Sequence, residues 1–251
     1  MDDTSGTAAV HFDFSGVRVL VTGGTRGIGA AVAAGFHAAG AQVLITGSAP
    51  DAAGYEALPP HAGYLQLRLS EREDIQAVAA SAGRIDVLVN NAGGTGGAFT
   101  PYDFDTAVSV NLNAVFHLTE GLADALAGSR VRGGASVVNL ASEMSLFGSP
   151  YFYGYGAAKA AIVQLTRSFC VSLAPRGIRV NAVLPGSVPT PMTNPFAEDP
   201  GVHKMVCDAT PLARWGEPRE IADAVMFLAS PAASFVSGHT LVVDGGYSIM
   251  K

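Results

Sequence analysis

The chain has 251 residues, 49% of them hydrophobic and 14% charged, which excludes a disordered polymer and indicates a large buried core. Its formal net charge of -6 argues against a surface for nucleic acid or an anionic membrane, and its apolar stretches are too short to span a bilayer. Two cysteines, Cys170 and Cys207, and six histidines show no metal-ligand spacing, so we expect no metal and a reducing, cytoplasmic compartment.

Strands and helices alternate along almost the whole chain. Continuous apolar runs rich in β-branched residues predict strands at 17–21, 42–46, 64–69, 86–90, 135–140, 179–184 and 240–244. Helical spacing of apolar residues predicts helices at 28–39, 71–81, 104–127, 155–174 and 218–229. Because buried strands joined by crossover helices form parallel sheets, the expected fold class is α/β: a single Rossmann-like, doubly wound parallel sheet with helices on both faces.

Two segments fall outside this alternation. Residues 1–12 are acidic and rich in small residues, without the features of a signal peptide, and are expected to form a flexible tail before one domain at 13–251. Residues 185–209 hold several prolines and are expected to be irregular. A long irregular segment in a compact domain is more often a lid or binding loop than a domain boundary.

Residues 22–29, Thr-Gly-Gly-Thr-Arg-Gly-Ile-Gly, lie where the first strand becomes the first helix. Glycines there allow a tight turn and let backbone amides approach a pyrophosphate, which a helix N-terminus also attracts. The turn therefore predicts dinucleotide binding, although its Gly-x-x-x-Gly-x-Gly spacing also fits an ordinary strand–helix turn.

The choice of nicotinamide cofactor depends on the end of the second strand, where a carboxylate would bind the ribose hydroxyls and repel a 2′-phosphate. This strand ends Thr46-Gly47-Ser48, with no carboxylate before Asp51, and Arg26 in the glycine turn could pair with a phosphate. NADP(H) is therefore favoured over NAD(H), with the alternative that Arg26 is only a solvated loop charge.

Tyr155 and Lys159 lie four residues apart at the start of a predicted helix, so their side chains share one face. A free tyrosine has a pKa near ~10, and a neighbouring ammonium lowers that pKa by favouring the phenolate. Ser142 follows the strand at 135–140, at the carboxyl edge where open α/β sheets bind ligands. The three side chains are candidates for proton exchange with a carbonyl or an alcohol.

The ordered set of motifs resembles the short-chain dehydrogenase/reductase family, of the 3-oxoacyl-acyl-carrier-protein reductase type, from about Phe14 to Tyr247. The matching parts are the glycine turn, Asn90-Asn91-Ala92-Gly93 after a strand, Asn111 in the next helix, then Ser142, Tyr155 and Lys159. Pro185-Gly186 with Val188 and Thr190 resembles the family's loop on the nicotinamide side. Asp244-Gly245-Gly246 resembles the sequence near the family's C-terminus.

The resemblance implies a role for each matching residue. Tyr155 would exchange the proton, Lys159 would bind the nicotinamide ribose and lower the tyrosine pKa, Ser142 would orient the carbonyl oxygen, and Asn111 would hold a water that links Lys159 to solvent. Asn90 with Gly93 would pack on the adenosine ribose, whereas Asn91 and Asp86 would pin neighbouring backbone. The residues implied to contact the cofactor are Gly23, Thr25, Arg26, Gly27, Ile28, Ser48, Leu69, Asn90, Ala92, Gly93, Tyr155, Lys159, Pro185, Gly186, Val188 and Thr190. A homotetramer, usual in the family, is also implied.

One position departs from the family pattern. Where the family usually has an acidic residue that contacts the adenine, this chain has Arg68. An arginine cannot accept a hydrogen bond from the adenine amino group, although it could stack on the ring. We therefore expect cofactor affinity or orientation to be unusual.

The implied function is reversible hydride transfer between NAD(P)(H) and a small-molecule secondary alcohol or ketone. Substrate contacts are expected from 94–99, 143–153 and 189–207, whose aromatic residues and methionines suit a hydrophobic, cyclic or 3-oxoacyl carbonyl compound better than a charged sugar. Within these segments Glu143 could face the pocket or be structural, and Cys207 could touch substrate. Two alternatives stay open: a nucleotide-binding regulator without activity, and an isomerase or dehydratase on the same fold.

Overall fold

The computed structural model describes residues 10–55, 58, 61–94 and 104–250. Most of the tail predicted at 1–12 therefore lies outside the described residues, as does the predicted substrate segment from residue 95 onward. Within the described ranges, none of the helices combines the length and the apolarity needed to cross a lipid bilayer.

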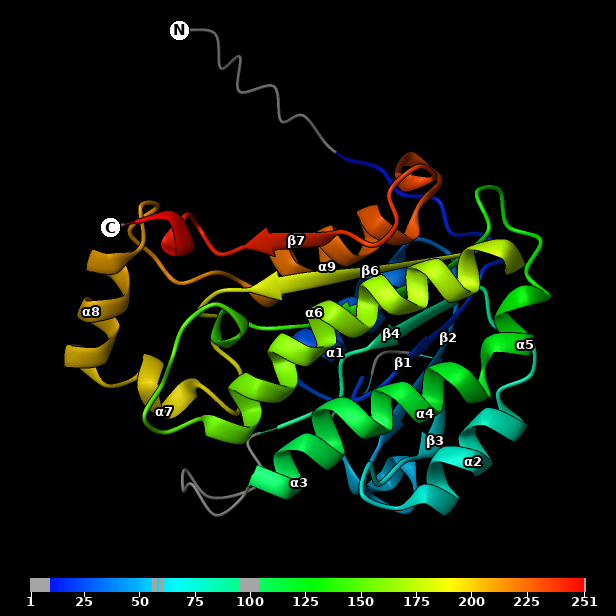
Figure 1. The fold of residues 1–251 in the computed structure, drawn as a ribbon, viewed down its shortest axis with the longest axis horizontal. Helices are drawn as coiled ribbons and strands as arrows, with labels where there is room; N and C mark the ends of the chain where they lie inside the picture. Colours follow the sequence, from blue (N-terminus) through cyan, green and yellow to red (C-terminus); the bar gives the residue numbers. More distant parts are fainter. Residues whose placement is uncertain (1–9, 56–57, 59–60, 95–103, 251) are drawn as a thin grey trace, which may run out of the picture.

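The strands form a parallel sheet in the order β3-β2-β1-β4-β5-β6-β7, which confirms the doubly wound prediction (Figure 1). The order reverses between β1 and β4, so a crevice for ligands is expected at the carboxyl ends of these two strands. The strands are β1 (Arg18–Val21), β2 (Gln42–Gly47), β3 (Gly63–Gln66), β4 (Val87–Asn90), β5 (Ala135–Leu140), β6 (Ile178–Pro185) and β7 (Thr240–Val243).

Helices cover both faces of this sheet. α1 (Gly27–Ala38) and α9 (Pro218–Ala229) pack on one face, and α2 (Arg72–Ser81), α4 (Ala114–Gly121) and α6 (Tyr153–Leu173) pack on the other (Figure 1). Successive side chains of a strand point to opposite faces, so in β1 Val19 and Val21 join the first core and Leu20 joins the second. The central strands β4, β5 and β6 are buried at every position because both of their faces are covered.

Most predicted boundaries are confirmed to within two residues, and those of β5 and α9 match the predicted ranges. Among the strands the exception is β3, which ends at Gln66 rather than at residue 69. Beyond that point the backbone amide of Arg68 donates to the Asp74 carboxylate (2.9 Å) in the first turn of α2. The chain therefore leaves the strand ladder earlier than its apolar pattern indicates.

The single helix predicted at 104–127 is wrong. The segment is divided into α3 (Phe104–Val108), a π-helical turn (Ser109–Asn113), α4 and α5 (Ala123–Ala127). In the π turn the side chain of Asn111 turns inward and donates to the carbonyl oxygens of Gly94 (2.7 Å) and Ala107 (2.8 Å). π turns of this kind often mark functional sites and leave the apolar periodicity of the sequence nearly unchanged.

The segment 185–209 is also more ordered than predicted, because it contains α7 (Asn194–Ala197) and α8 (Pro200–Ala209). Asp199 caps α8 by accepting a hydrogen bond from the Val202 amide (2.9 Å). Pro200 occupies the first helical position, where the missing amide of proline has no helical partner to lose. Here the proline marks a helix start.

Candidate active site

The glycine turn joins β1 to α1 at the carboxyl edge of the sheet. Gly23 and Gly27 have φ angles of +63° and +56°, in the left-handed region that favours glycine. A Cβ atom on Gly29 would collide with the Gly23 carbonyl oxygen and with the amide of Asn91. The N-cap residue Arg26 makes no capping hydrogen bond through its side chain, so the first amides of α1 stay available for an anion.

Asn91 holds the ends of β1 and β4 together. Its Nδ2 donates to the carbonyl oxygens of Thr22 (2.9 Å) and Gly23 (3.2 Å), and its backbone amide donates to the Thr22 hydroxyl (3.0 Å). At the other end of β4, the Asp86 carboxylate accepts from the Arg18 amide (2.9 Å). The structural roles predicted for Asn91 and Asp86 are confirmed.

The side chain of Asn90 points into the core and belongs to a buried polar ladder of Thr119, Asn90, Asn139 and Thr166. Asn90 Nδ2 donates to the Thr119 hydroxyl on α4 (3.0 Å) and to Asn139 Oδ1 on β5 (2.8 Å). Asn139 Nδ2 donates in turn to the Thr166 hydroxyl on α6 (2.9 Å). Only the main chain of Asn90 is therefore left for the predicted contact with the adenosine ribose.

Gly93 lies between Asn111 and Lys159. A Cβ atom at Gly93 would collide with Asn111 Oδ1 and would lie 3.7 Å from Lys159 Nζ. Asn111 Oδ1 also accepts from the Gly94 amide (3.1 Å), so the fully buried asparagine fixes the backbone that follows β4. The water expected beside Asn111 stays a prediction.

Ser142, Tyr155 and Lys159 come together where β5 ends and α6 begins. Lys159 is 4% exposed; its Nζ donates to the Leu140 carbonyl oxygen (2.7 Å) and lies 5.6 Å from the centroid of the Tyr155 ring. The Ser142 hydroxyl accepts from the Met144 amide (3.2 Å) and is also a hydrogen-bonding partner of Tyr155. The structure thus brings these three predicted catalytic residues to one place.

The pKa shifts in this cluster differ from the sequence prediction. Burial raises the pKa of Tyr155, the hydrogen bond with Ser142 opposes that rise, and the charge of Glu143 adds to it. Burial also lowers the pKa of Lys159 to about 8. The predicted lowering of the tyrosine pKa by Lys159 is therefore wrong for the chain by itself, because the ammonium is directed at the Leu140 carbonyl and is itself weakened by burial.

Glu143, which the sequence left undecided between pocket and scaffold, joins the turn after β5 to the loop after β6. Its Oε1 accepts from the Ser187 hydroxyl (3.2 Å), whereas its Oε2 is buried with no hydrogen-bond partner among the described residues. Burial raises the pKa of Glu143 to about 7; the Ser187 hydrogen bond opposes the rise and the charge of Asp244 adds to it. The only sequence signal for this carboxyl group was its position next to Ser142.

The loop after β6 reaches back to the glycine turn. The Thr193 hydroxyl accepts from the Thr190 amide (2.8 Å) and donates to the Val188 carbonyl oxygen (2.5 Å), which folds the loop on itself. Thr190 lies against Gly27, where an added Cβ atom would meet the threonine Cβ at 3.3 Å. The nicotinamide-side residues predicted from the sequence, Pro185, Gly186, Val188 and Thr190, therefore belong to a segment that borders the glycine turn.

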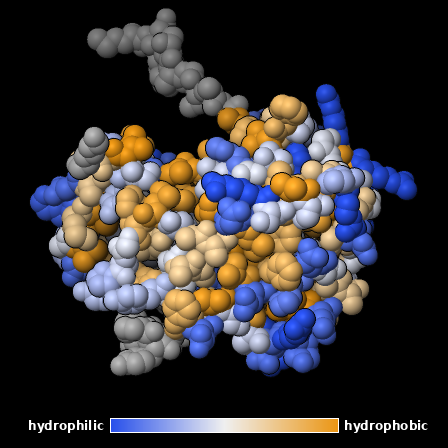
Figure 2. All heavy atoms as spheres, viewed as in Figure 1, coloured by the Kyte–Doolittle hydropathy of each residue, from blue (hydrophilic) through white to orange (hydrophobic). Residues whose placement is uncertain are grey.

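Apolar side chains gather around the loop, α7 and α8. Figure 2 shows hydrophobic atoms on this side of the molecule. The exposed hydrophobic residues in the predicted substrate segments and beside them include Phe147, Tyr151, Met192, Met205 and Leu212. Cys207, on α8, is half-buried. Across the described ranges, no three His, Cys, Asp or Glu side chains are placed to hold a metal ion.

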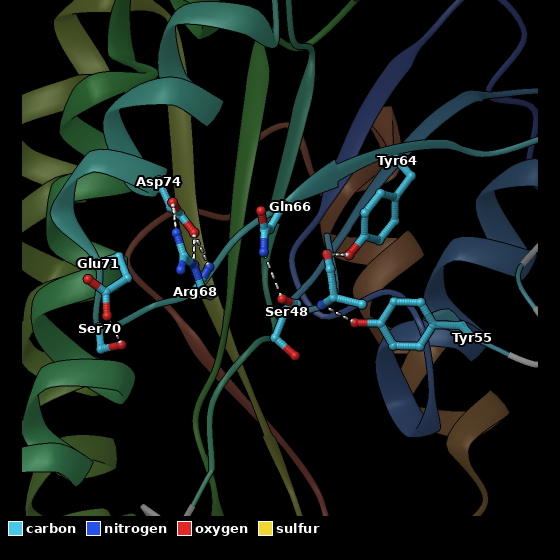
Figure 3. Close-up of polar contacts among 9 residues, drawn as sticks. Ser48, Tyr55, Tyr64, Gln66, Arg68, Ser70, Glu71 and Asp74 are labelled. Atoms are coloured by element: carbon cyan, nitrogen blue, oxygen red, sulfur yellow. Dashed lines mark hydrogen bonds and ion pairs between the residues drawn. The ribbon is translucent and has the colours of Figure 1, made fainter. Parts of the chain in front are cut away.

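Two tyrosines hold the end of β2 (Figure 3). The Tyr55 hydroxyl accepts from the Ala49 amide (3.0 Å), and the Tyr64 hydroxyl donates to the Ala49 carbonyl oxygen (2.6 Å). On the neighbouring strand, Gln66 Nε2 donates to the Ser48 carbonyl oxygen (3.0 Å). These bonds fix the backbone at Ser48, the residue predicted to lie near the 2′ position of the cofactor.

Arg68 is tied to the first turn of α2 (Figure 3). Its Nε donates to Asp74 Oδ2 (2.8 Å) and its Nη2 donates to Asp74 Oδ1 (2.9 Å), so the contact is bidentate. Hydrogen bonds from the side chain and the backbone of Arg68 lower the pKa of Asp74 to about 2. The Arg68 side chain is still 53% exposed, so Asp74 orients the guanidinium plane while the plane remains open to solvent.

Comparison with known proteins places this site in a family. Residues 23–248 match the family described as enoyl-(acyl carrier protein) reductase. The 5-keto-D-gluconate 5-reductase of Escherichia coli (strain K12) is 35% identical over 248 residues, which cover 94% of this chain and 96% of that protein. The 3-oxoacyl-(acyl-carrier-protein) reductase of Thermotoga maritima is 36% identical over 243 residues, which cover 92% of this chain and 97% of that protein.

A solved structure shows the same fold. The crystal structure of a gluconate 5-dehydrogenase from Burkholderia cenocepacia J2315, in complex with NADP and tartrate, has a TM-score of 0.83 and 32% identity, with 95% of this chain and 98% of that chain covered. The chain therefore belongs to the short-chain dehydrogenase/reductase family and is an NAD(P)-dependent oxidoreductase that interconverts an alcohol and a ketone.

Proposed function

We propose that this protein interconverts an apolar ketone and its secondary alcohol with NADP(H), and that Tyr155 exchanges the proton with the reacting oxygen. The observation that carries the proposal is the convergence of Ser142, Tyr155 and Lys159 beside Gly93. Burying a phenol and an ammonium together costs stability, and a protein that only bound a nucleotide would gain nothing from that cost.

The residues present fit a dinucleotide. The turn at Gly29 is too crowded for a side chain, and the amides that begin α1 have no side-chain cap from Arg26, which together make a cradle for a pyrophosphate. Gly23, Thr25, Gly27 and Ile28 would line this cradle. Bound NADP(H) would supply or accept the hydride. The adenosine half would contact Ser48, Leu69, Asn90, Ala92 and Gly93, and the nicotinamide half would contact Lys159, Pro185, Gly186, Val188 and Thr190.

In the direction of reduction, Tyr155 would act as the proton donor. A phenol whose pKa is raised by burial is protonated at neutral pH and so holds the proton that the ketone oxygen needs. The Ser142 hydroxyl, a partner of the phenol, would donate a hydrogen bond to the same oxygen and orient it. Lys159, with a pKa of about 8, is mostly charged at neutral pH and would bind the nicotinamide ribose.

The preference for NADP(H) rests on charge at the end of β2. Arg26 is the N-cap of α1, within the glycine turn, and Ser48, which follows the last residue of β2, offers a hydroxyl. Asp51, the first carboxylate after β2, is engaged with its own turn, where Oδ1 accepts from the Ala53 amide (3.0 Å). A 2′-phosphate would therefore meet a cation and a hydroxyl rather than a carboxylate.

An apolar ketone, cyclic or 3-oxoacyl, fits the exposed hydrophobic side chains near the crevice better than a charged sugar. Two relatives, by contrast, are named for the sugar acids gluconate and 5-keto-D-gluconate. A substrate panel separates the two: reduction of cyclic and 3-oxoacyl ketones with NADPH is expected, and exclusive activity on 5-keto-D-gluconate would refute this substrate class.

The test of the proton donor is Tyr155→Phe. This change is expected to abolish turnover while the affinity for NADPH, measured by fluorescence titration, stays within about twofold. An active variant would show that another group supplies the proton. The same titration is expected to give an affinity for NADPH about tenfold or more above that for NADH, since one charged contact is worth that much.

We also propose that the chain forms a homotetramer. Phe116 on α4 and Val171 on α6 are exposed hydrophobic residues on two helices, and Val242 is exposed on the edge strand β7. Light scattering coupled to size-exclusion chromatography is expected to give four times the chain mass. A monomer would contradict the proposal.

A further inference from the structure

Glu143 is a buried acidic group that no step of the proposed proton exchange uses. It directly follows Ser142, whose hydroxyl is a hydrogen-bonding partner of Tyr155. Its Oε1 accepts from the Ser187 hydroxyl (3.2 Å), its Oε2 is buried without a hydrogen-bond partner, and within the described ranges it takes part in no ion pair. Its charge, once formed, is therefore poorly compensated and acts on its neighbours through a medium of low dielectric constant.

One charged group that faces Glu143 is Asp244, which follows β7. This strand is the neighbour of β6 in the sheet (Figure 1), and an added Cβ atom at Gly186 would meet the Asp244 Cβ at 2.8 Å, so Asp244 borders the loop after β6. The Asp244 carboxylate accepts from the amides of Gly246 (2.8 Å) and Ser248 (2.7 Å). Burial opposes these hydrogen bonds, but the pKa of Asp244 is lowered overall, so Asp244 stays ionised and Glu143 gains no cation on this side.

The other titratable group that faces Glu143 is the phenol of Tyr155 on α6. Burial raises the pKa of this phenol, the hydrogen bond with Ser142 opposes the rise, and the charge of Glu143 adds to it. The ammonium of Lys159 is directed at the Leu140 carbonyl oxygen (2.7 Å) and lies 5.6 Å from the centroid of the phenol ring. When Tyr155 loses its proton, the phenolate and the Glu143 carboxylate are therefore two like charges that repel each other.

We propose that Glu143 is a positioning residue that acts through Tyr155, because its buried negative charge holds the proton on the phenol. Burial raises the pKa of Glu143 to about 7, so this charge is present above neutral pH, in the range where the phenol itself ionises. Tyr155 then remains a proton donor for ketone reduction, and the phenolate that alcohol oxidation requires forms only at higher pH. This inference rests on Tyr155 as the proton-exchanging group of the proposed function.

The test follows the ionisation of Tyr155 by two measurements. The first needs no substrate: the absorbance of tyrosinate is recorded against pH in the protein with NADP+, and subtraction of the Tyr155→Phe signal isolates one phenol. The second is the pH profile of kcat/KM for the alcohol that corresponds to the best ketone of the substrate panel. Glu143→Gln removes the charge and is expected to lower both midpoints by about one pH unit. Glu143→Leu, which has no polar group, is expected to do the same.

The matched control is Ser187→Ala, which removes the contact between Glu143 and the loop after β6 but leaves the charge. Its midpoint for Tyr155 is expected to stay within about 0.3 unit of the wild-type value. Glu120→Gln, which removes an exposed carboxylate on α4, is expected to have no effect on the midpoint. If Glu143 served only to join the two segments, Ser187→Ala would resemble Glu143→Gln.

The proposal is overturned if both Glu143 variants keep the midpoint within about 0.3 unit of the wild type, or if Ser187→Ala lowers it as much as they do. It is also overturned if the phenol of the Glu143 variants does not ionise before the protein unfolds. Thermal melting shows whether the variants fold, and failure of both would contradict the proposal, since loss of a buried charge is expected to stabilise the chain. Absence of turnover with every ketone, together with the expected shift in absorbance, would overturn the proposed function alone.

Discussion

Replacing Glu143 by glutamine removes a buried group that is costly to ionise, and the size of the effect depends on pH. The pKa of this carboxyl group is raised from 4.5 to about 7 in the folded chain. A raised carboxyl pKa means that the folded state holds a proton which the unfolded state has already released. Stability is therefore undiminished below pH 4.5, falls as the pH rises from 4.5 to 7, and stays reduced above pH 7.

The magnitude follows from the shift. At ~1.4 kcal/mol for each unit of pKa, ionisation of Glu143 costs the folded state about 3 kcal/mol at pH 8. At pH 5 about 0.8 kcal/mol of this cost is already present, and Glu143→Gln has no proton to lose, so its stability relative to the wild type is expected to be about 2.5 kcal/mol better at pH 8 than at pH 5. For a chain of this length, that difference corresponds to a Tm change of roughly 5–10 °C.

The assay is thermal unfolding followed by circular dichroism, on both proteins at pH 5 and at pH 8. The exposed Glu120→Gln on α4 is the matched control, because it removes a carboxylate without removing a buried charge. Its Tm difference from the wild type is expected to be the same at both pH values. The reasoning is refuted if Glu143→Gln also shows equal differences at both pH values, or a larger gain at pH 5.

Two further substitutions test the glycine turn and a buried arginine at the start of β6. Gly29→Ala would force a Cβ atom onto the Gly23 carbonyl oxygen and the side-chain amide of Asn91. We therefore expect a loss of about 1–3 kcal/mol of stability, measured by thermal melting, and at least tenfold weaker NADPH binding, measured by titration. Arg179→Met would remove the hydrogen-bond donor from five carbonyl oxygens around α9 and β6, so we expect the free energy of unfolding to fall by about 3 kcal/mol or more. The control Arg176→Met, at an exposed ion pair, is expected to lower it by less than about 1 kcal/mol. Equal melting temperatures for the two arginine variants would contradict this account.

The sequence was sufficient to predict the sheet because the residue types within each strand and the alternation of strands with helices indicate the same fold. The strand at 135–140 is buried at every position and four of its six residues are apolar, a pattern typical of a strand covered on both faces. The convergence of Ser142 with Tyr155 followed from strand order and helical spacing. Both properties depend on residue type at fixed separations, which a sequence displays directly.

The features that sequence analysis missed depend on contacts between segments. The π turn at Asn111 differs from an α-helix by one hydrogen-bond shift, and a side chain that reaches Gly94 provides the compensating contacts. The direction of Lys159 Nζ, toward Leu140 rather than toward the phenol, is a rotamer choice that spacing does not determine. The pair of Arg68 with Asp74 crosses a strand–helix junction, where neither helical nor strand periodicity applies.

The polar ladder of Thr119, Asn90, Asn139 and Thr166 has a mechanical consequence for the reactive phenol. Apolar contacts tolerate sliding, whereas hydrogen bonds are directional and fail when a helix moves along its axis by one residue, about 1.5 Å. Thr166 lies about three turns beyond Tyr155 on α6. Its hydrogen bond with Asn139 fixes the position of α6 along its axis relative to β5. The position of the Tyr155 hydroxyl relative to the strand ends therefore depends on a hydrogen bond inside the core. A substitution at Thr166 would displace the phenol and lower the activity, although Thr166 does not touch the site.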